Sequence, residues 1–277
     1  MSAARIKELE KRIAHRIGEA IHEWGLISEG DRILVGFSGG KDSATLLYFL
    51  RYFQKRSPVR YTFFALHLDQ GEPGFPVDQV REFLEREGFE HRIIREDIET
   101  LVRERIPEGK NPCPLCSRFR RGIIYNRAVE MGATKIALGH HRDDAIETLL
   151  LNLFFAGQLK AMPALLHSDD GRNTVIRPMI YVAEEDIREF ATLSGFPALS
   201  CSGCGGRERD RMTHLLDELS ARSPEIRANI LAAIRNVAGS HLLDPRLPGA
   251  PGAPGVPLPS GNTADLSLPA HPPQELP

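Results

Sequence analysis

The sequence predicts an α/β protein built on a doubly wound parallel sheet, with further helices at its N- and C-terminal ends. From residue 32 to residue 156, runs of β-forming residues alternate with segments of helical periodicity. A glycine-rich turn joins the first of these runs to the helix that follows it. Strands that alternate with helices indicate a parallel sheet covered on both faces.

Composition sets the class of protein. The chain has 277 residues, of which 42% are hydrophobic and 26% are charged, as in a globular protein. Its net charge of −2 carries no global signature of nucleic-acid binding, so any such binding must come from a local patch. The N-terminal residues contain acids and no apolar run, and no segment has the length of a membrane span. We therefore expect a cytoplasmic protein with no membrane partner.

The elements follow one another with clear boundaries. Residues 3–24 have apolar side chains at helical spacing, which predicts an amphipathic helix packed on the domain with a solvated cationic face. Contact of that face with RNA is the alternative. We expect strands at about 32–37, 61–68, 91–95 and 135–138, helices at about 42–56, 77–88, 117–131 and 143–156, and one or two helices in 206–240.

Four regions result from this reading. Residues 1–26 form the N-terminal helix, and residues 27–200 form the sheet domain, which includes the first cysteine pair. Residues 201–244 hold the second cysteine pair and the C-terminal helices. Residues 245–277 contain ten prolines and too few apolar residues for a core, which predicts a disordered tail.

The turn after the first strand reads Ser38-Gly39-Gly40-Lys41-Asp42-Ser43. Two glycines let the backbone approach an anion, and the N–H groups of the following helix point toward it. The turn is not a Walker A loop, because only three residues separate Gly36 from Gly40-Lys41 and no Ser or Thr follows the lysine. A phosphate cradle is the functional interpretation, and a glycine turn without a ligand is the alternative.

Ligands in such sheets bind beyond the carboxyl ends of the strands, where loops 38–43, 69–76 and 139–144 converge. Asp143 and Asp144 in the third loop are suited to Mg²⁺ brought by ATP. The alternative is a capping box formed by Asp144 and Glu147. The histidines are interpreted as structural: His67, His140, His141, His214 and His241.

All four cysteines lie in two Cys-x-x-Cys pairs, Cys113/Cys116 and Cys201/Cys204. In an intracellular chain this pattern favours a metal site or redox chemistry over structural disulfides. A structural zinc site with four cysteines remains open, although 84 residues lie between the pairs. An iron–sulfur cluster and a persulfide-carrying pair are the other interpretations.

A basic helix is predicted directly after Cys116. It carries Arg118, Arg120 and Arg121 and no acid nearby. Arginine binds phosphate through two parallel hydrogen bonds, so a basic helix beside a reactive thiol suits an RNA substrate. A merely solvated face is the alternative.

These motifs together resemble a known family. The turn at 38–43 resembles the PP-loop of the ATP-pyrophosphatase superfamily, whose fold is adenine nucleotide α-hydrolase-like. The whole series is similar to the tRNA-cytidine 2-sulfurtransferase family over roughly residues 1–244. The matching segments are 38–43, Leu68-Asp69-Gln70, 73–76, 106–110, Cys113 to Ile123, Ala137 to Asp144, 168–171 and Ile176-Arg177-Pro178.

The resemblance implies an ATP-dependent tRNA thiolase. AMP would pass to the 2-oxygen of a cytidine, at position 32, and sulfur would then be transferred through a 4Fe-4S cluster. The implied cofactors are ATP, Mg²⁺ and the cluster, and the implied partners are tRNA, a cysteine desulfurase or other sulfur donor, and a second copy in a homodimer.

Site residues are carried over by position. The implied catalytic residues are Lys41, Asp42 and Asp143, and the implied RNA-binding residues are Arg118, Arg120 and Arg121. The implied cluster ligands are Cys113, Cys116 and Cys204, with Cys201 as second choice. The implied ATP-binding residues are Ser38, Gly39, Gly40, Lys41, Asp42, Ser43, Gly139 and Asp144.

One segment departs from the family pattern. The family's second cysteine pair reads Pro-Cys-Asn-Leu-Cys-Gly-Ser, whereas residues 200–206 read Ser-Cys-Ser-Gly-Cys-Gly-Gly and an arginine-rich stretch follows. Two other functions therefore stay open: another PP-loop reaction on tRNA, such as thiolation of a different nucleoside or lysidine-type amine addition, and a non-catalytic nucleotide-binding redox sensor with a four-cysteine zinc site.

Overall fold

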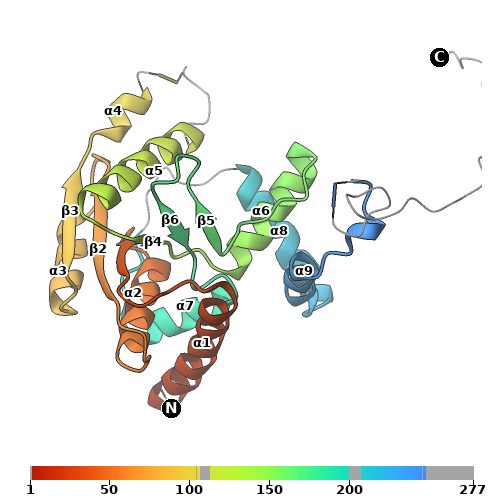
Figure 1. The fold of residues 1–277 in the computed structure, drawn as a ribbon, viewed down its shortest axis with the longest axis horizontal. Coiled ribbons are helices and arrows are strands. Elements are labelled where there is room, and N and C mark those ends of the chain that lie inside the picture. Colours follow the sequence, from red (N-terminus) through yellow and green to blue (C-terminus); the bar gives the residue numbers. More distant parts are fainter. Residues whose placement is uncertain (1, 104, 107–112, 200–206, 245, 248–277) are drawn as a thin grey trace, which may run out of the picture. The chain divides into compact units, whose positions relative to one another are not determined.

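A single sheet of six strands organises the computed structural model, which describes residues 2–103, 105–106, 113–199, 207–244 and 246–247. The strand order is β3-β2-β1-β4-β6-β5 (Figure 1). All neighbouring pairs are parallel except β5 and β6. The strands are β1 (Arg32–Gly36), β2 (Thr62–Asp69), β3 (His91–Arg95), β4 (Lys135–Ala137), β5 (Leu165–His167) and β6 (Thr174–Ile176).

The sheet is mostly parallel, as predicted. Strands β5 and β6, which were not among the predicted strands, form an antiparallel hairpin at its edge. Each of these strands has three residues, too few for an alternating pattern to stand out from the sequence. The predicted set also lacks helices α4 (Ile98–Arg103) and α7 (Glu184–Leu193).

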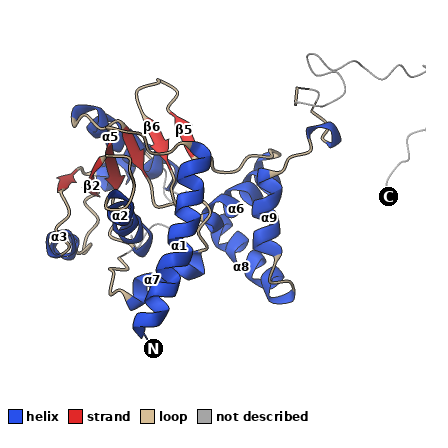
Figure 2. Cartoon of the chain, turned by 60° about the horizontal axis from the view of Figure 1, so that its bottom comes forward, coloured by secondary structure: helices blue, strands red, loops and turns tan. Residues whose placement is uncertain are grey.

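Helices cover both faces of the sheet, as predicted (Figures 1 and 2). On β1, Ile33 and Val35 belong to a core shared with α1, α2, α3 and α7, whereas Leu34 packs on the other side with residues of α5. This alternation follows from the two-residue period of a strand. These helices are α1 (Ser2–Trp24), α2 (Lys41–Gln54), α3 (Val77–Arg86) and α5 (Cys113–Glu130).

The remaining helices follow β4 and β6. They are α6 (Arg142–Leu151), α8 (Arg207–Arg222) and α9 (Ile226–Arg235), so residues 206–240 contain two α-helices. The helix expected over 143–156 is α-helical only to Leu151 and continues as a π-helical turn, Asn152–Ala156. The helix expected to start at 117 begins four residues earlier, at Cys113.

The N-terminal helix packs on the domain as its periodicity predicts. Leu9, Ile13 and Ile17 are fully buried or nearly so, and α1 lies against α7. Part of its cationic face is neutralised there, because Arg5 and Arg12 pair with Glu189 and Asp186 of α7. Those two arginines therefore have an intramolecular role.

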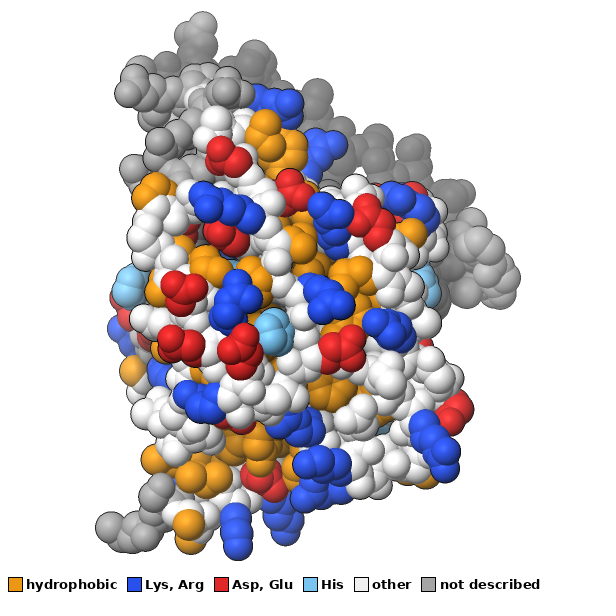
Figure 3. Space-filling view, turned by 90° about the vertical axis from the view of Figure 1, so that its left-hand side faces the viewer, with side chains coloured by type: hydrophobic (Ala, Val, Ile, Leu, Met, Phe, Trp, Pro, Cys, Tyr) orange, Lys and Arg blue, Asp and Glu red, His pale blue; other side chains and the backbone are white. Residues whose placement is uncertain are grey.

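Strand β3 forms one edge of the sheet, on the left-hand side of Figure 1. On the face seen from that side, basic and acidic side chains are interspersed, with hydrophobic patches between them (Figure 3). The strand itself carries His91, Arg92 and Arg95. Charged side chains on an edge strand discourage pairing with another chain.

The chain divides into two compact units, Met1–Leu231 and Ala232–Pro277. The first contains the sheet and every site residue discussed below. In the second, described residues include the 3-10 turn Gly239–His241 and an ion pair between Arg246 and Asp244. The predicted tail lies almost entirely outside the described residues. Among the helices that are described, none has the length and apolar character needed to cross a membrane.

Candidate functional site

The PP-loop joins the end of β1 to the start of α2 (Lys41–Gln54). Its N-cap is Gly40, which makes no side-chain capping hydrogen bond. The first amides of a helix have no partner within the helix, so this end of α2 presents N–H donors and the positive end of the helix dipole. That is the arrangement expected of a phosphate site.

The two loop glycines are required by the local packing. Gly39 has φ of +86°, and a Cβ there would lie 3.2 Å from a methyl carbon of Val80 and 3.3 Å from one of Leu199. A Cβ on Gly40 would lie 3.2 Å from the carbonyl oxygen of Leu199. The backbone therefore takes a path that a larger residue would block.

Two serines hold the loop in shape. Ser43 Oγ donates to the carbonyl of Gly40 at 3.0 Å and accepts from the backbone N–H of Ser38 at 3.2 Å. Ser38 Oγ accepts from the N–H of Gly40 at 3.2 Å. The predicted ATP-binding serines thus have a structural task in the loop.

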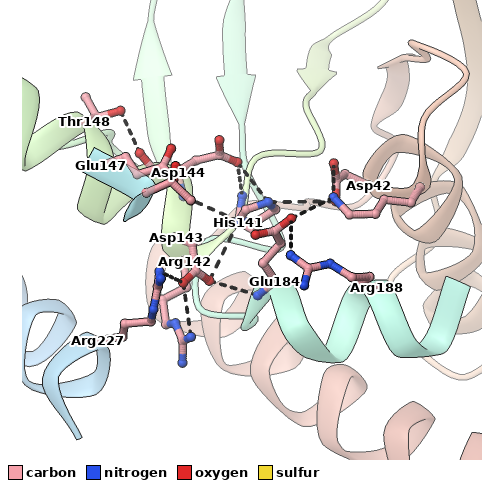
Figure 4. A network of polar contacts seen from close by, with 12 residues as sticks. Asp42, His141, Arg142, Asp143, Asp144, Glu147, Thr148, Glu184, Arg188 and Arg227 are labelled. Carbon is pink, nitrogen blue, oxygen red and sulfur yellow. Dashed lines mark hydrogen bonds and ion pairs between the residues drawn. The ribbon is translucent and has the colours of Figure 1, made fainter. Parts of the chain in front are cut away.

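Lys41 lies between two carboxylates. Its Nζ is 2.9 Å from Asp42 Oδ1 and 3.1 Å from Glu184 Oε1 (Figure 4). Burial lowers the pKa of Lys41, but the two carboxylates outweigh it and the pKa lies above its usual value. The lysine therefore stays charged at neutral pH. Sequence reasoning missed Glu184, because α7 was not predicted and nothing local links it to the PP-loop.

The loop after β4 meets the PP-loop directly. A Cβ on Gly139 would lie 3.1 Å from both the carbonyl carbon of Asp42 and the backbone nitrogen of Ser43. Only a residue without a side chain allows this approach. The predicted convergence of loops 38–43 and 139–144 is therefore present, with Gly139 at the contact point.

His141 begins α6 (Arg142–Leu151) as its N-cap. The N–H of Asp144 donates to His141 Nδ1 at 3.4 Å, and the N–H of His141 donates to Asp144 Oδ2 at 3.0 Å. This reciprocal capping box corrects the alternative in which Asp144 capped the helix together with Glu147. His141 Nε2 also lies 3.8 Å from Asp42 Oδ1, which places the N-cap of α6 beside the first turn of α2.

Asp143 is held on both oxygens by protein donors. Oδ1 accepts from Arg227 at 2.7 Å and from Arg142 at 3.2 Å, and Oδ2 accepts from the N–H of Glu184 at 2.9 Å. Burial raises the pKa of Asp143, but these donors outweigh it and the pKa lies below its usual value. This arrangement gives Asp143 a positioning role between α6, α7 and α9, which differs from the predicted contact with Mg²⁺.

Asp42 and Asp144 are the predicted carboxylates that retain some exposure. Their side chains are 33% and 20% exposed, against 4% for Asp143. Mg²⁺ in nucleotide sites is usually bound by one or two carboxylates, phosphate oxygens and water. The pair Asp42 and Asp144 fits that requirement.

Helix α8 (Arg207–Arg222) is attached to α6. Arg209 Nη1 contacts Asp144 Oδ1 at 2.9 Å and Glu147 Oε2 at 2.8 Å, and Thr213 Oγ1 donates to Glu147 Oε1 at 2.8 Å. Burial raises the pKa of Glu147 above its usual value despite these donors. The arginine-rich stretch at 207–211 is the sequence signal for this contact, but its partners are not visible in the sequence.

The first cysteine pair opens α5 beside the same edge of the sheet. Cys116 packs in an apolar cluster with Leu68 and Ile98, and its Sγ donates to Gln70 Oε1 at 3.3 Å. Gln70 directly follows β2, the neighbour of β1. Cys116 therefore adjoins the loop predicted to share the nucleotide edge.

The second pair lies outside the described residues, as does the side chain of Cys113. Leu199, two residues before Cys201, donates its N–H to the carbonyl of Gly39 at 3.2 Å. The chain that leads into the second pair is thus attached to the PP-loop. Within the described ranges, no group of three or more His, Cys, Asp or Glu side chains is arranged to hold a metal ion.

The predicted RNA-binding arginines differ in their setting. Arg118 and Arg121 are exposed, whereas Arg120 is half-buried. Arg118 also lines a groove along α5. Arg118 and Arg121 are therefore the more accessible of the three, and Arg118 is the one that lines this groove.

Comparison with known proteins decides the family. A family model described as a PP-loop domain matches residues 9–197. A tRNA-cytidine(32) 2-sulfurtransferase from Anaeromyxobacter sp. (strain K) is 50% identical over 242 residues, which cover 86% of this chain and 83% of that protein. The chain belongs to the tRNA-cytidine(32) 2-sulfurtransferase family.

Further relatives agree with this membership. A tRNA-cytidine(32) 2-sulfurtransferase from Escherichia coli O139:H28 (strain E24377A / ETEC) is 46% identical over 245 residues, covering 87% of this chain and 79% of that one. Among solved structures, the U34-tRNA thiolase NcsA from Methanococcus maripaludis with its 4Fe-4S cluster matches with a TM-score of 0.71 and 21% identity. That match covers 89% of this chain and 85% of the other, and confirms the predicted fold.

Proposed function

We propose that this family member is an ATP-dependent sulfurtransferase that forms 2-thiocytidine at position 32 of tRNA. One observation supports the proposal beyond family membership: Cys116 of the first pair and Leu199, the last described residue before the second pair, both contact the nucleotide edge. Cys116 bonds to Gln70 after β2, and Leu199, just before the second pair, bonds to Gly39 of the PP-loop. A sulfur chemistry and an adenylation chemistry would then share one site.

The PP-loop residues would perform the first half of the reaction. The amides at the start of α2 and the charged Lys41 would bind the β- and γ-phosphates, while Asp42 and Asp144 would hold Mg²⁺. The 2-oxygen of the cytidine attacks the α-phosphorus, the bond from that phosphorus to the bridging oxygen breaks, and pyrophosphate leaves. Positive charge around the departing pyrophosphate stabilises this step.

The cysteines would serve the second half. When bound, a 4Fe-4S cluster on Cys113, Cys116 and Cys204, with Cys201 as second choice, would supply the position from which sulfur reaches carbon 2. Sulfur at the oxidation level of sulfide forms its bond to that carbon, and AMP leaves with the former 2-oxygen. Sulfur that arrives as a persulfide must first accept two electrons from a thiol reductant. Cys113 and Cys116 stand one turn apart at the start of α5, and Cys116 packs in the apolar cluster around Leu68, which supports a partly buried position for an iron–sulfur cluster held by this pair.

Partners follow from the reaction. tRNA is the substrate, and Arg118, Arg120 and Arg121 would bind its phosphates. A cysteine desulfurase or other sulfur donor must supply the sulfur, a second copy would complete a homodimer, and the reaction would take place in the cytoplasm.

The direct test is mass spectrometry of tRNA nucleosides from cells with and without the gene. We expect 2-thiocytidine only where the gene is present, and its return with the wild-type gene but not with Lys41→Ala. Unchanged 2-thiocytidine after deletion would contradict the proposal. Activity retained by a variant lacking all four cysteines would instead favour amine addition, and binding of ATP without any pyrophosphate release in the presence of tRNA would favour a non-catalytic nucleotide sensor.

A further inference from the structure

A groove of about 500 Å³ runs along the outer side of α5. One wall is Arg105, which follows α4, and the rest comes from successive turns of α5. The function proposed above assigns nothing to it except Arg118. Its lining includes Arg105, Arg118, Phe119, Gly122, Ile123 and Asn126.

The lining combines an aromatic floor with a cationic rim. The guanidinium of Arg105 lies over the Phe119 ring, 5.3 Å from its centroid. Arg118 is exposed and also lines the groove, and none of the lining residues that the structure describes is acidic. Within the described ranges Arg118 forms no ion pair, so its charge is available to a ligand. Nucleotides bind to this combination, because bases stack on rings and guanidinium planes while arginine binds phosphate.

Gly122 keeps the middle of the groove open. It lies in the interior of an 18-residue helix, where glycine is less favourable than alanine. A Cβ at this position would meet no atom within 4 Å, so no packing requirement explains the missing side chain. A larger side chain here would instead project into the space of the groove.

The groove is also close to the sulfur site. Phe119 stands one helical turn after Cys116, and both pack in the same apolar cluster together with Leu68. We propose that the groove binds one unpaired nucleotide of the tRNA, a neighbour of the target cytidine, with its base on Phe119 and its phosphate on Arg105 and Arg118. This inference rests on the proposed tRNA-thiolation function.

An RNA strand explains the groove better than a protein partner does. An acidic peptide would use the two arginines but has no need of an aromatic floor beside an open slot. Single-stranded nucleic acid needs both, because stacking contributes to affinity at each base and phosphate contacts add a salt-dependent term. A sulfur-carrying protein at this surface is therefore an outcome that the test must be able to reveal.

The test measures binding of a transcribed tRNA with cytidine at position 32 by fluorescence anisotropy at several salt concentrations. Gly122→Leu should weaken binding by roughly tenfold by filling the groove, while Gly122→Ala should have little effect. Arg118→Ala should reduce the slope of log K against log salt by about 1. Arg81→Ala, an exposed arginine on α3, is the matched control and should leave both quantities unchanged.

Stability and ATP affinity are measured on the same variants. Both Gly122 substitutions add a side chain to open space in a helix, so their melting temperatures should equal or exceed that of the wild type. Wild-type tRNA affinity in Gly122→Leu would overturn the proposal, and slower sulfur uptake from a protein donor in that variant would assign the groove to the donor instead. If the wild type binds tRNA through the groove but makes no 2-thiocytidine, the groove stands and the proposed reaction fails.

Discussion

Arg209 Nη1 lies 2.8 Å from Glu147 Oε2 and joins α8 to α6. Arg209 comes five residues after Cys204, and Leu199, two residues before Cys201, is bonded to Gly39. The segment that carries the second cysteine pair is therefore attached at both of its ends to elements of the nucleotide edge. We therefore propose that Arg209 is a positioning residue for the second cysteine pair.

Arg209→Ala should loosen this attachment. Burial already raises the pKa of Glu147, and loss of the guanidinium should raise it further. Because Arg209 is partly exposed, we expect the free energy of unfolding to fall by only about 1 kcal/mol. Iron retained after anaerobic reconstitution should fall clearly. Arg211→Ala, an exposed arginine on the same helix, is the control, and equal iron content in both variants would refute the positioning role.

Lys41→Ala should abolish tRNA-dependent pyrophosphate release, by at least about 100-fold, because it removes a charge directed at phosphate. Glu184 keeps its ion pair with Arg188 at 3.1 Å, so the fold should persist. Pyrophosphate release and circular dichroism measure the two effects, with the exposed Lys55→Ala as control. Wild-type turnover by Lys41→Ala would mean that the PP-loop is wrongly assigned.

Gly139→Ala should damage the nucleotide site through sterics alone. The new Cβ would lie 3.1 Å from backbone atoms of Asp42 and Ser43, so the first turn of α2 must move. We expect a loss of about 1–3 kcal/mol in the free energy of unfolding and weaker ATP binding. Gly18→Ala is the matched control, because Gly18 lies within α1, where alanine is favoured over glycine. Its new Cβ would make an ordinary 3.7 Å contact with the Phe53 ring of α2. Urea denaturation and ATP titration would show whether the two substitutions differ.

Asp31 should make stability depend on pH. Asp31 directly precedes β1 and is buried. Its carboxylate forms an ion pair with Lys135 at 2.8 Å and accepts a hydrogen bond from the hydroxyl of Thr134 at 2.7 Å. Burial raises its pKa, but Lys135 and the hydrogen bonds outweigh this and the folded-state pKa is lowered. The contribution of Asp31 to the free energy of unfolding is therefore complete above the unfolded-state pKa of about 3.9. It disappears as the pH falls through the lower folded-state pKa.

Asp31→Asn should lower the free energy of unfolding by about 2–3 kcal/mol at pH 7, because it leaves Lys135 without its buried partner. The difference from the wild type should shrink below about pH 4. Urea denaturation at pH 7, 5 and 3 measures it. A difference that stays constant over this range would show that the charge of Asp31 is not responsible.

The cysteine ligands can be tested by spectroscopy before any activity is measured. Anaerobically purified protein should show the broad visible absorption of an iron–sulfur cluster. Cys113→Ala, Cys116→Ala and Cys204→Ala should each lose it, and Cys201→Ser should lose less, because three thiolates would hold the cluster. One zinc ion bound by all four cysteines would close the site and contradict the proposed sulfur transfer.

Local sequence was sufficient for the main framework. The strand that ends before Ser38, the glycine turn and the start of α2 are encoded within twelve consecutive residues, so periodicity and turn chemistry predict them directly. The family resemblance also rests on short segments read in order. The predicted strands ended with the one at 135–138 and did not include the β5–β6 hairpin, because two three-residue strands carry too little pattern.

Tertiary structure decided how the site is held. Gly139 was predicted from the sequence, but the reason it must be glycine is the backbone of Asp42, almost a hundred residues away. Asp143 was predicted to approach Mg²⁺, whereas in this structure its carboxylate accepts hydrogen bonds from Arg227 and from the N–H of Glu184. A carboxylate in a sequence is equally suited to a metal and to a guanidinium, and only the packing of distant helices determines which of them it meets.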